Sequence, residues 1–425
     1  MLISQLTHFT QIAVAGTKVR FNKDHYAACC IVISASWIFM VMVGLLTING
    51  NAQTPDEHDK ISIRLFENEP TESIRLKSDS SPIMVSGDGV DLTRLDPRES
   101  NVKISMVGSK VYLDTNDSTY SNEKFTLLVN DNEYFTIDHP DLPTRYYPDQ
   151  ISIMAESGQL KILNTTDFEV YISGVVGAEM NFDEPDALKA QAVIARTYAR
   201  WLLNQNSDSS YDILDHTLNQ VYKGVFPNNP EYKTATRQTT DQILTYDDRP
   251  ILAAYSSTCG GITSSNKGFW EGRDLPYLNR VADGGACQLS PHYQWTFAVK
   301  SEKFFSKINE YTGGNWQSVI TGEKDSSGRW KSMYVQTADS EEPMNISGVS
   351  FRQIVNAVFG SYALKSMRFT LEYRANEVIF DGKGMGHGIG LCQWGAKGLA
   401  RSGWNYAEIL KFYYSGVELT DYQNL

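Results

Sequence analysis

The clearest hydrophobic pattern in the chain lies within the segment 175–201, where apolar positions recur with helical spacing after residue 186. Asp183 is suited to cap this helix, and Pro185 is suited to its first turn, where a backbone donor is not needed. We therefore predict a long amphipathic helix that begins just after Asp183. Its buried face is expected to consist of Ala187, Leu188, Gln191, Ala192, Ala195, Tyr198 and Leu202.

A second face of the predicted helix carries Lys189, Arg196 and Arg200, whose spacing places the three cations on one side. A solvated face is one interpretation, and a surface that holds an anionic polymer is the other. Glu179 precedes the helix in a predicted Gly-flanked turn, where the lone carboxylate is a candidate for acid–base chemistry. The segment therefore indicates a functional site as well as a structural element.

The longest apolar run in the chain spans residues 27–47 and contains no charged residue. Its length suits a transmembrane helix, and the polar, basic segment 1–26 before it predicts a cytoplasmic N-terminus. A cleaved signal peptide is the alternative, because Gly50 and Ala52 are spaced like a cleavage site. We expect a retained single-pass anchor at the cell membrane, with the rest of the chain outside the cytoplasm.

Short apolar alternations, for example at 61–66 and 102–107, are set among polar residues between positions 48 and 149. This pattern is typical of strands, so we expect a linker followed by a small β-rich region without a catalytic cluster. Further strands, including 168–176, are predicted to lead into the Glu179 turn. The mixture of strands and helices beyond them indicates one α+β domain over 150–425.

The composition is that of an ordinary globular protein, with 41% hydrophobic and 21% charged residues in 425. The formal net charge of -12 argues against nucleic-acid binding through a broad basic surface. An exported acidic protein with one small cationic face is a better match to a sugar polymer than to a duplex.

Glycines alternate strictly between positions 382 and 390, in the sequence GKGMGHGIG. No frame of this loop fits the dinucleotide fingerprint G-x-G-x-x-G, so a nucleotide site is not expected. The glycines instead allow positive φ angles and a close approach of the backbone to a ligand. His387 within the loop and Gln393 after it are candidate ligand contacts, whereas Trp394 is expected to pack in the core.

Three cysteines, Cys259, Cys287 and Cys392, lie in the predicted exported body. A disulfide between Cys259 and Cys287 would close a loop of nearly thirty residues and stabilise the fold by about 3 kcal/mol. The alternative is a nucleophilic Cys259 assisted by His387, as in a cysteine amidase or peptidase.

The motifs together resemble the SpoIID/LytB family, the stage II sporulation protein D and amidase-enhancer group. The segment from Val175 to Trp201 matches the family's signature turn and helix, and further motifs follow in the family's order. These include YSSTCGGITSS from Tyr255, SPHYQW from Ser290 and GKGMGHGIGLCQWGAKGLARSGW from Gly382. The resemblance covers roughly residues 150–420.

This resemblance implies a peptidoglycan lytic transglycosylase in which Glu179 is the catalytic residue. Such an enzyme cleaves peptide-stripped glycan strands and leaves 1,6-anhydro-muramic ends, with one glutamate acting first as acid and then as base. The family also implies an alternative, a non-catalytic amidase enhancer that binds glycan and activates a partner cell-wall amidase. No cofactor and no nucleic acid are expected with either function.

We expect the substrate to be held by Lys189, Arg196, Tyr255, Ser256, His387 and Gln393. Because Lys189 and Arg196 would favour an ionised Glu179, whereas an acid catalyst must begin protonated, we expect both cations to contact substrate instead of Glu179. Some relatives carry a metal after the signature helix, but here that stretch offers only His216 and no cysteine, so we predict no metal site.

Overall fold

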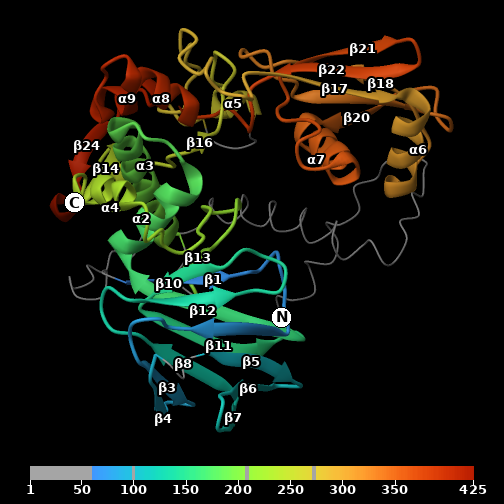
Figure 1. Ribbon diagram of the computed structural model, residues 1–425. Helices are drawn as coiled ribbons and strands as arrows, with labels where there is room; N and C mark the ends of the chain where they lie inside the picture. The colour runs from blue at the N-terminus through green and yellow to red at the C-terminus, as the bar shows by residue number, and fades with distance from the viewer. Residues whose placement is uncertain (1–59, 98–100, 206–209, 270–273) are drawn as a thin grey trace, which may run out of the picture. The chain divides into compact units, whose positions relative to one another are not determined.

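The computed structural model describes residues 60–97, 101–205, 210–269 and 274–425 (Figure 1). The predicted cytoplasmic segment 1–26 and anchor 27–47 lie outside these ranges. Within the described ranges, no helix is both long enough and apolar enough to cross a membrane. The chain divides into a larger compact unit and a smaller one, whose described part is mostly residues 294–383.

The N-terminal part of the larger unit is made of strands, as the alternating pattern predicted. In β1 (Lys60–Leu65), for example, Ile61, Ile63 and Leu65 point inward while the intervening residues are more exposed. Among the described residues, the seven strands of one sheet follow the order β13 (Ile213–Leu214), β1, β12 (Gln159–Asp167), β11 (Gln150–Glu156), β8 (Lys124–Leu128), β3 (Ile83–Gly87) and β4 (Val90–Leu95).

A six-stranded sheet, again counted over the described residues, accompanies the first. Its order is β10 (Arg145–Pro148), β9 (Tyr134–Asp138), β2 (Ser73–Lys77), β5 (Val102–Val107), β6 (Lys110–Asp114) and β7 (Thr119–Asn122). Strands β11 and β12 join the same sheet as β1 and β8, so pairing is continuous across position 150, where the sequence suggested a domain boundary.

Helix α2 (Phe168–Glu179) follows β12 directly and replaces the strand and turn that the sequence suggested there. Asp167 caps it by accepting a hydrogen bond from the Val170 amide at 2.9 Å. The β-branched residues of this segment favour a strand, but close packing selects the helix. A Cβ at Gly174 would lie only 2.5 Å from the Gly224 carbonyl oxygen, so α2 packs tightly on its neighbours.

Helix α3 (Pro185–Leu203) confirms the predicted amphipathic helix, with Pro185 in its first turn. Its N-cap is Glu184 instead of the predicted Asp183, and no side chain caps its amides. The helix contacts α2, α4 (Pro230–Arg237), α8 (Gln393–Arg401), α9 (Tyr406–Tyr413) and β14 (Gln242–Tyr246) (Figure 1). Strand β14 lies between β15 (Arg249–Pro250) and β24 (Glu418–Asp421), and the chain ends in a short 3-10 helix, η1 (Tyr422–Asn424).

The alternating-glycine loop packs against the segment that begins at β16 (Tyr255–Ser256). Strand β23 (Leu391–Cys392) pairs parallel to β16, and single bridges join Thr258 to Met385 and Ser264 to Ile389. The predicted positive φ angles are confirmed at Gly384, Gly386, Gly388 and Gly390. The close backbone approach that the glycines permit is made here to the protein's own chain, since a Cβ at Gly390 would lie 1.8 Å from the Ala254 carbonyl oxygen.

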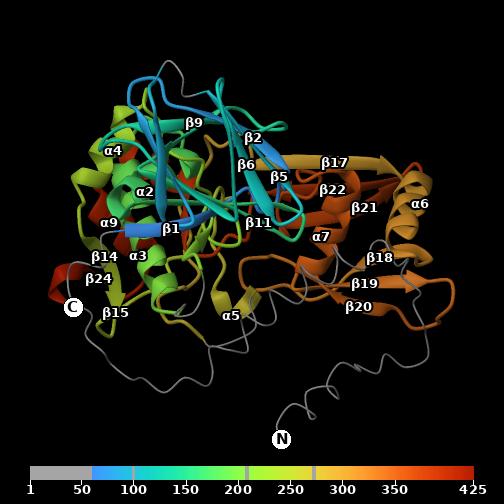
Figure 2. The ribbon, with the colours of Figure 1, turned by 90° about the horizontal axis from the view of Figure 1, so that it is seen from below.

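Residues 294–383 make up most of the described part of the smaller unit, which also takes in residues 268–269, and the sequence did not distinguish this unit from the surrounding domain. One sheet contains β17 (Gln294–Lys300), β22 (Glu377–Lys383) and β21 (Phe369–Arg374), and the other contains β18 (Trp316–Thr321), β19 (Ser332–Thr337) and β20 (Met344–Ser347). Helices α6 (Ser301–Thr312) and α7 (Gly348–Phe359) contact strands of this unit (Figure 2). The unit has a core of its own, which includes Phe304, Phe351 and Phe380. A short helix, α5 (Asn266–Phe269), precedes β17 in the chain.

The packing at Gly390 predicts a stability effect larger than that of its φ angle alone. Gly390 and Gly416 have φ angles of 70° and 69°, but a Cβ at Gly416 would meet only a Tyr246 ring atom at 3.6 Å. We expect Gly416→Ala to cost about 1–2 kcal/mol of unfolding free energy for its left-handed backbone, and Gly390→Ala to cost at least about 2 kcal/mol more. Equal losses in denaturant unfolding of the two variants would contradict this packing.

Candidate active site

Glu179 is the last residue of α2, and the carboxylate is held by the loop that follows β13. Its Oε1 atom accepts a hydrogen bond from the Val221 amide at 2.9 Å. The residue as a whole is half-buried, but protein atoms surround the carboxyl group closely enough for burial to be the largest influence on its pKa. A carboxyl group in this position is fixed by the backbone instead of by a cation.

Burial raises the pKa of Glu179 above its ordinary value of 4.5. The Val221 amide, the Tyr255 hydroxyl, the Gln393 amide and the charge of Lys223 lower this pKa in turn, but they do not offset the desolvation. The C-terminus of α2 adds partial negative charge beside the carboxylate, which also disfavours ionisation. The sequence predicted a turn at Glu179, whereas the structure places it at the C-terminus of α2.

Tyr255 and Gln393 come from distant parts of the chain and converge on Glu179. The Gln393 Nε2 atom donates to the Glu179 backbone oxygen at 3.1 Å and lies 3.4 Å from the Gln191 Oε1 atom. The Tyr255 hydroxyl is buried and has no aligned hydrogen-bond partner among the described residues, although it lies close enough to influence the carboxylate. The pairing of β16 with β23 brings Tyr255 and Gln393 together.

Ser256 shares this neighbourhood, and its Oγ atom is also buried without a hydrogen-bond partner in the described part of the chain. Its Cβ atom would be 3.0 Å from a Cβ built at Gly386, immediately before His387. His387 is half-buried, and its Nδ1 atom accepts from the Ile389 amide at 3.0 Å, which braces the glycine loop. A polar group that is buried without a partner is costly, so Ser256 marks a place where a polar ligand would be favourable.

Arg196 lies inside the protein and is occupied by structural contacts. Its guanidinium group forms a double hydrogen bond to Glu169, at 2.6 Å for each N–O pair, and donates to the Gln242 carbonyl oxygen at 2.9 Å. The side chain is 1% exposed. The sequence predicted that this face of α3 meets solvent or substrate, but in the structure other parts of the protein cover it at Arg196. We therefore do not include Arg196 among the proposed substrate-binding residues. The expectation that Arg196 does not contact Glu179 agrees with these contacts.

The other two cations of α3 also lie against protein groups. Arg200 is buried between the rings of Phe168 and Tyr422, with its Cζ atom 4.0 and 4.2 Å from the two ring centroids. Lys189 is half-buried, with its Nζ atom 3.7 Å from Asp186 and 5.8 Å from the centre of the Tyr406 ring. No direct contact of Lys189 with Glu179 is seen, so its predicted role stays a proposal.

Trp394 is half-buried, and its ring packs edge to face on Phe182, with ring centroids 4.9 Å apart. The Lys397 Nζ atom lies 4.4 Å from the centre of the Phe182 ring and 3.6 Å from Glu184. This cluster fixes the link between α2 and α3 and so helps to position Glu179, in agreement with the packing role predicted for Trp394.

Several residues near Glu179 were not predicted from the sequence to belong to the site. Lys223 is exposed, and its charge acts on the carboxylate, while Gln220 and Gln191 supply neighbouring amides. The sequence offered only a weak signal, a polar segment YDILDHTLNQVYKGV without a recognisable spacing. His216, considered above as a metal ligand, instead pairs with Glu67 at 2.8 Å.

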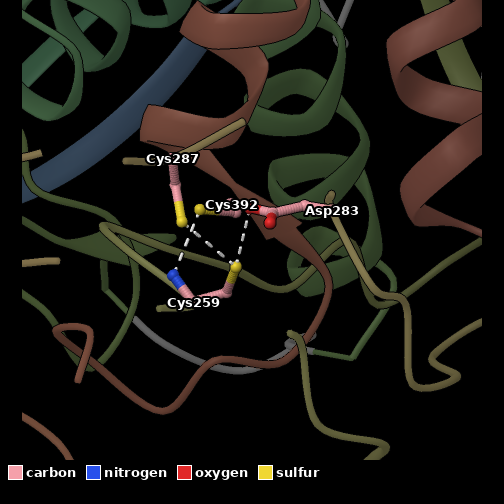
Figure 3. Close-up of side chains that lie close together, drawn as sticks. All are labelled: Cys259, Asp283, Cys287 and Cys392. Carbon is pink, nitrogen blue, oxygen red and sulfur yellow. Dashed lines mark hydrogen bonds between the residues drawn. The ribbon is translucent and has the colours of Figure 1, made fainter. Parts of the chain in front are cut away.

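The predicted disulfide between Cys259 and Cys287 is not formed in this structure, where their sulfur atoms are 3.6 Å apart. Cys392 and Asp283 join them in a buried cluster (Figure 3). Hydrogen bonding to Cys287 and Cys392, together with burial, raises the pKa of the Cys259 thiol. A raised pKa and full burial disfavour the alternative of a nucleophilic Cys259, which requires an accessible thiolate.

The fold and the site together define a class: an α+β protein with a glutamate of raised pKa at the end of a helix that packs on a second helix. A family model described as stage II sporulation protein matches residues 156–246, which contain β12, α2 and α3. The chain is 30% identical over 270 residues to stage II sporulation protein D of Bacillus subtilis, covering 60% of this chain and 74% of that protein.

Two further relatives are similar over the same extent. An uncharacterized protein of Brachyspira hyodysenteriae is 33% identical over 269 residues, covering 62% of this chain and 69% of the relative. The amidase enhancer of Bacillus subtilis is 32% identical over 297 residues, covering 59% of this chain but 40% of that longer protein. The chain belongs to the SpoIID/LytB family of stage II sporulation protein D and amidase enhancer.

The raised pKa of Glu179 predicts a specific dependence of stability on pH. Between pH 4.5 and the raised pKa, the folded protein keeps a proton that the unfolded chain releases, so stability falls as pH rises through this window. Glu179→Gln keeps an acceptor for the Val221 amide and removes the fall in stability that ionisation of the carboxyl group causes. We expect the variant to be more stable than wild type at about pH 7, because the wild-type carboxyl group loses its proton in a buried position as pH rises and the neutral amide does not.

Denaturant unfolding across a pH series measures this difference, which should vanish at the acidic end. The exposed Glu418 provides a matched control, because Glu418→Gln makes the same chemical change on the surface and should leave the unfolding free energy close to that of wild type. A Glu179→Gln variant that is less stable than wild type at neutral pH would contradict the raised pKa.

Proposed function

We propose that the protein is a peptidoglycan lytic transglycosylase in which Glu179 is the general acid and then the general base. The observation that carries this proposal is the carboxyl group itself, which is buried at the C-terminus of α2 and has a raised pKa. A glutamate whose pKa is raised keeps its proton to higher pH than an ordinary glutamate and can donate it to a leaving group. Neither Lys189 nor Arg196 contacts this carboxyl group in a way that would hold it ionised.

In the proposed reaction, Glu179 donates its proton to the glycosidic oxygen as the bond from that oxygen to C1 of the muramic sugar breaks. The resulting carboxylate then takes the proton from the C6 hydroxyl of the same sugar, and the C6 oxygen bonds to C1. The products are a free hydroxyl on one strand end and a 1,6-anhydro ring on the other, and Glu179 is protonated again. One carboxyl group is sufficient because the nucleophile belongs to the substrate, whereas hydrolysis usually takes two.

Tyr255 and Gln393 are proposed to orient the substrate at Glu179, since Tyr255 in β16 and Gln393, which follows the paired strand β23, converge on it. The buried hydroxyls of Tyr255 and Ser256 would hydrogen-bond sugar hydroxyls or N-acetyl groups. Exposed Lys223 is proposed to bind substrate carboxylates beside the site. We also propose that His387 binds substrate, because it lies in the glycine loop. For Lys189 the same proposal rests only on the sequence motif that contains it.

The second candidate is a non-catalytic protein that binds glycan and activates a partner cell-wall amidase. The observation in its favour is the 32% identity to a relative named amidase enhancer. In this alternative the same surface would hold glycan, and the proton on Glu179 would have no chemical role.

We further propose that the run 27–47 anchors the protein in the cell membrane, with residues 48–425 outside the cytoplasm. The supporting observation is its uncharged apolar length after a basic segment. This placement would bring the domain to its proposed substrate in the cell wall.

The test of the proposed function is mass spectrometry of glycan products made by the full-length chain. Wild type incubated with peptide-stripped strands should release 1,6-anhydro-muramic ends, whereas Glu179→Gln should lose at least about 10³-fold in rate because the proton donor is gone. Glu418→Gln should keep wild-type activity. Equal product formation by Glu179→Gln would contradict the assigned residue.

A parallel co-sedimentation measurement with intact and stripped strands separates the two candidates. Binding by both wild type and Glu179→Gln without any cleavage of either substrate would overturn the enzyme proposal and favour the enhancer.

A further inference from the structure

Three cysteines and one aspartate, separated widely in the sequence, meet in the interior of the larger unit. The Sγ atoms of Cys259, Cys287 and Cys392 and one carboxylate oxygen of Asp283 all lie within 4.8 Å of one another (Figure 3). The three thiols are fully buried and Asp283 is 4% exposed. The sequence did not predict this group, because Cys392 lies 133 residues beyond Cys259 and the spacing matches no metal-binding motif.

The distances within the cluster suit one small ion. Four ligand atoms at about 2.0–2.3 Å from a tetrahedral Zn²⁺ lie roughly 3.3–3.8 Å from one another. The Cys259 and Cys287 sulfur atoms are 3.6 Å apart, and the Cys259 sulfur atom is 3.0 Å from the Asp283 Oδ2 atom. We propose that Cys259, Asp283, Cys287 and Cys392 form a tetrahedral site for a divalent zinc-like cation, in a place distinct from the His216 stretch.

Backbone groups around the cluster match the outer shell of a metal site. The amides of Cys259 and Gly395 point to the Cys392 sulfur atom at 3.1 and 3.3 Å, an arrangement that stabilises a thiolate ligand. The Asp283 Oδ1 atom accepts from the Gly285 amide at 3.0 Å, which leaves Oδ2 directed at the sulfur atoms. The carboxylate is thus oriented by one oxygen and available for coordination by the other.

Four protein ligands would close the coordination shell of the ion, so the site is structural and not catalytic. Binding would release the thiol protons to solvent and join three chain segments. Cys259 lies in the segment that carries Tyr255. Asp283 and Cys287 lie in the segment after Ala282, which bridges to Ile262, and Cys392 lies directly before Gln393 at the start of α8. The ion would therefore hold together the two strands that present Tyr255 and Gln393 to Glu179.

A disulfide is the competing chemistry for these residues. It would join two of the three thiols and leave the third buried beside Asp283. Thiol counting separates the two states, since the metal site keeps three thiols and the disulfide keeps one.

The first experiment uses the full-length chain with Cys29→Ser and Cys30→Ser, so that the remaining thiols are those of the cluster. The purified protein is incubated with Zn²⁺, freed of excess metal and unfolded without reductant, and both metal and thiols are counted. The proposal expects one Zn²⁺ and three thiols per chain. One thiol with no metal would establish the disulfide and overturn the site, and three thiols with no metal would overturn it as well.

The second experiment replaces the ion with Co²⁺, whose visible spectrum reports geometry and thiolate ligation. Metal-free protein titrated with Co²⁺ should saturate at one equivalent with tetrahedral bands and thiolate charge transfer. Asp283→Asn should weaken Co²⁺ binding at least tenfold, while Asp274→Asn outside the cluster should leave binding unchanged. An octahedral spectrum in the wild-type protein would overturn the proposed tetrahedral site. This outcome does not depend on whether the Asp283→Asn variant folds. Neither experiment uses glycan, so these results stand apart from the proposed activity.

Discussion

Desolvation of the Glu179 carboxyl group is the constraint on which the account of this protein depends. A carboxylate transferred into the protein interior loses hydration, and a single Val221 amide with weaker contributions from its neighbours does not replace it. The group therefore keeps its proton to higher pH than an ordinary glutamate. Placement at the end of α2, where the helix contributes partial negative charge, acts in the same direction.

The buried cation Arg196 on α3 is paired with Glu169 and makes no contact with the Glu179 carboxyl group. The Nε and Nη2 atoms of Arg196 each donate a hydrogen bond to the carboxylate of Glu169 at the start of α2. Breaking such a buried pair is costly, so Arg196 is fixed in place and its charge is neutralised locally. The same interaction ties α3 to α2, the helix that ends at Glu179.

Local chemistry was enough to predict α3, with Pro185 in its first turn, and the strands near the N-terminus of the described chain. It also predicted positive φ angles in the glycine loop, because alternating glycines have few other uses. The helical state of 168–179 was not predictable from local preference, since its β-branched residues favour strands and only packing against the 222–226 loop selects the helix. The partners of Arg196 and the cysteine cluster depend on contacts between residues far apart in sequence, which no spacing rule reports.

The protonation state of Glu179 in the folded protein is the most direct test of this account. It can be followed by the carbon-13 resonance of glutamate side-chain carboxyl groups across a pH titration, with the Glu179 signal identified as the one missing from Glu179→Gln. The account predicts a midpoint clearly above the ordinary value of 4.5. A midpoint at or below 4.5 would mean that Glu179 is ionised at neutral pH, and the general-acid role would have to be abandoned.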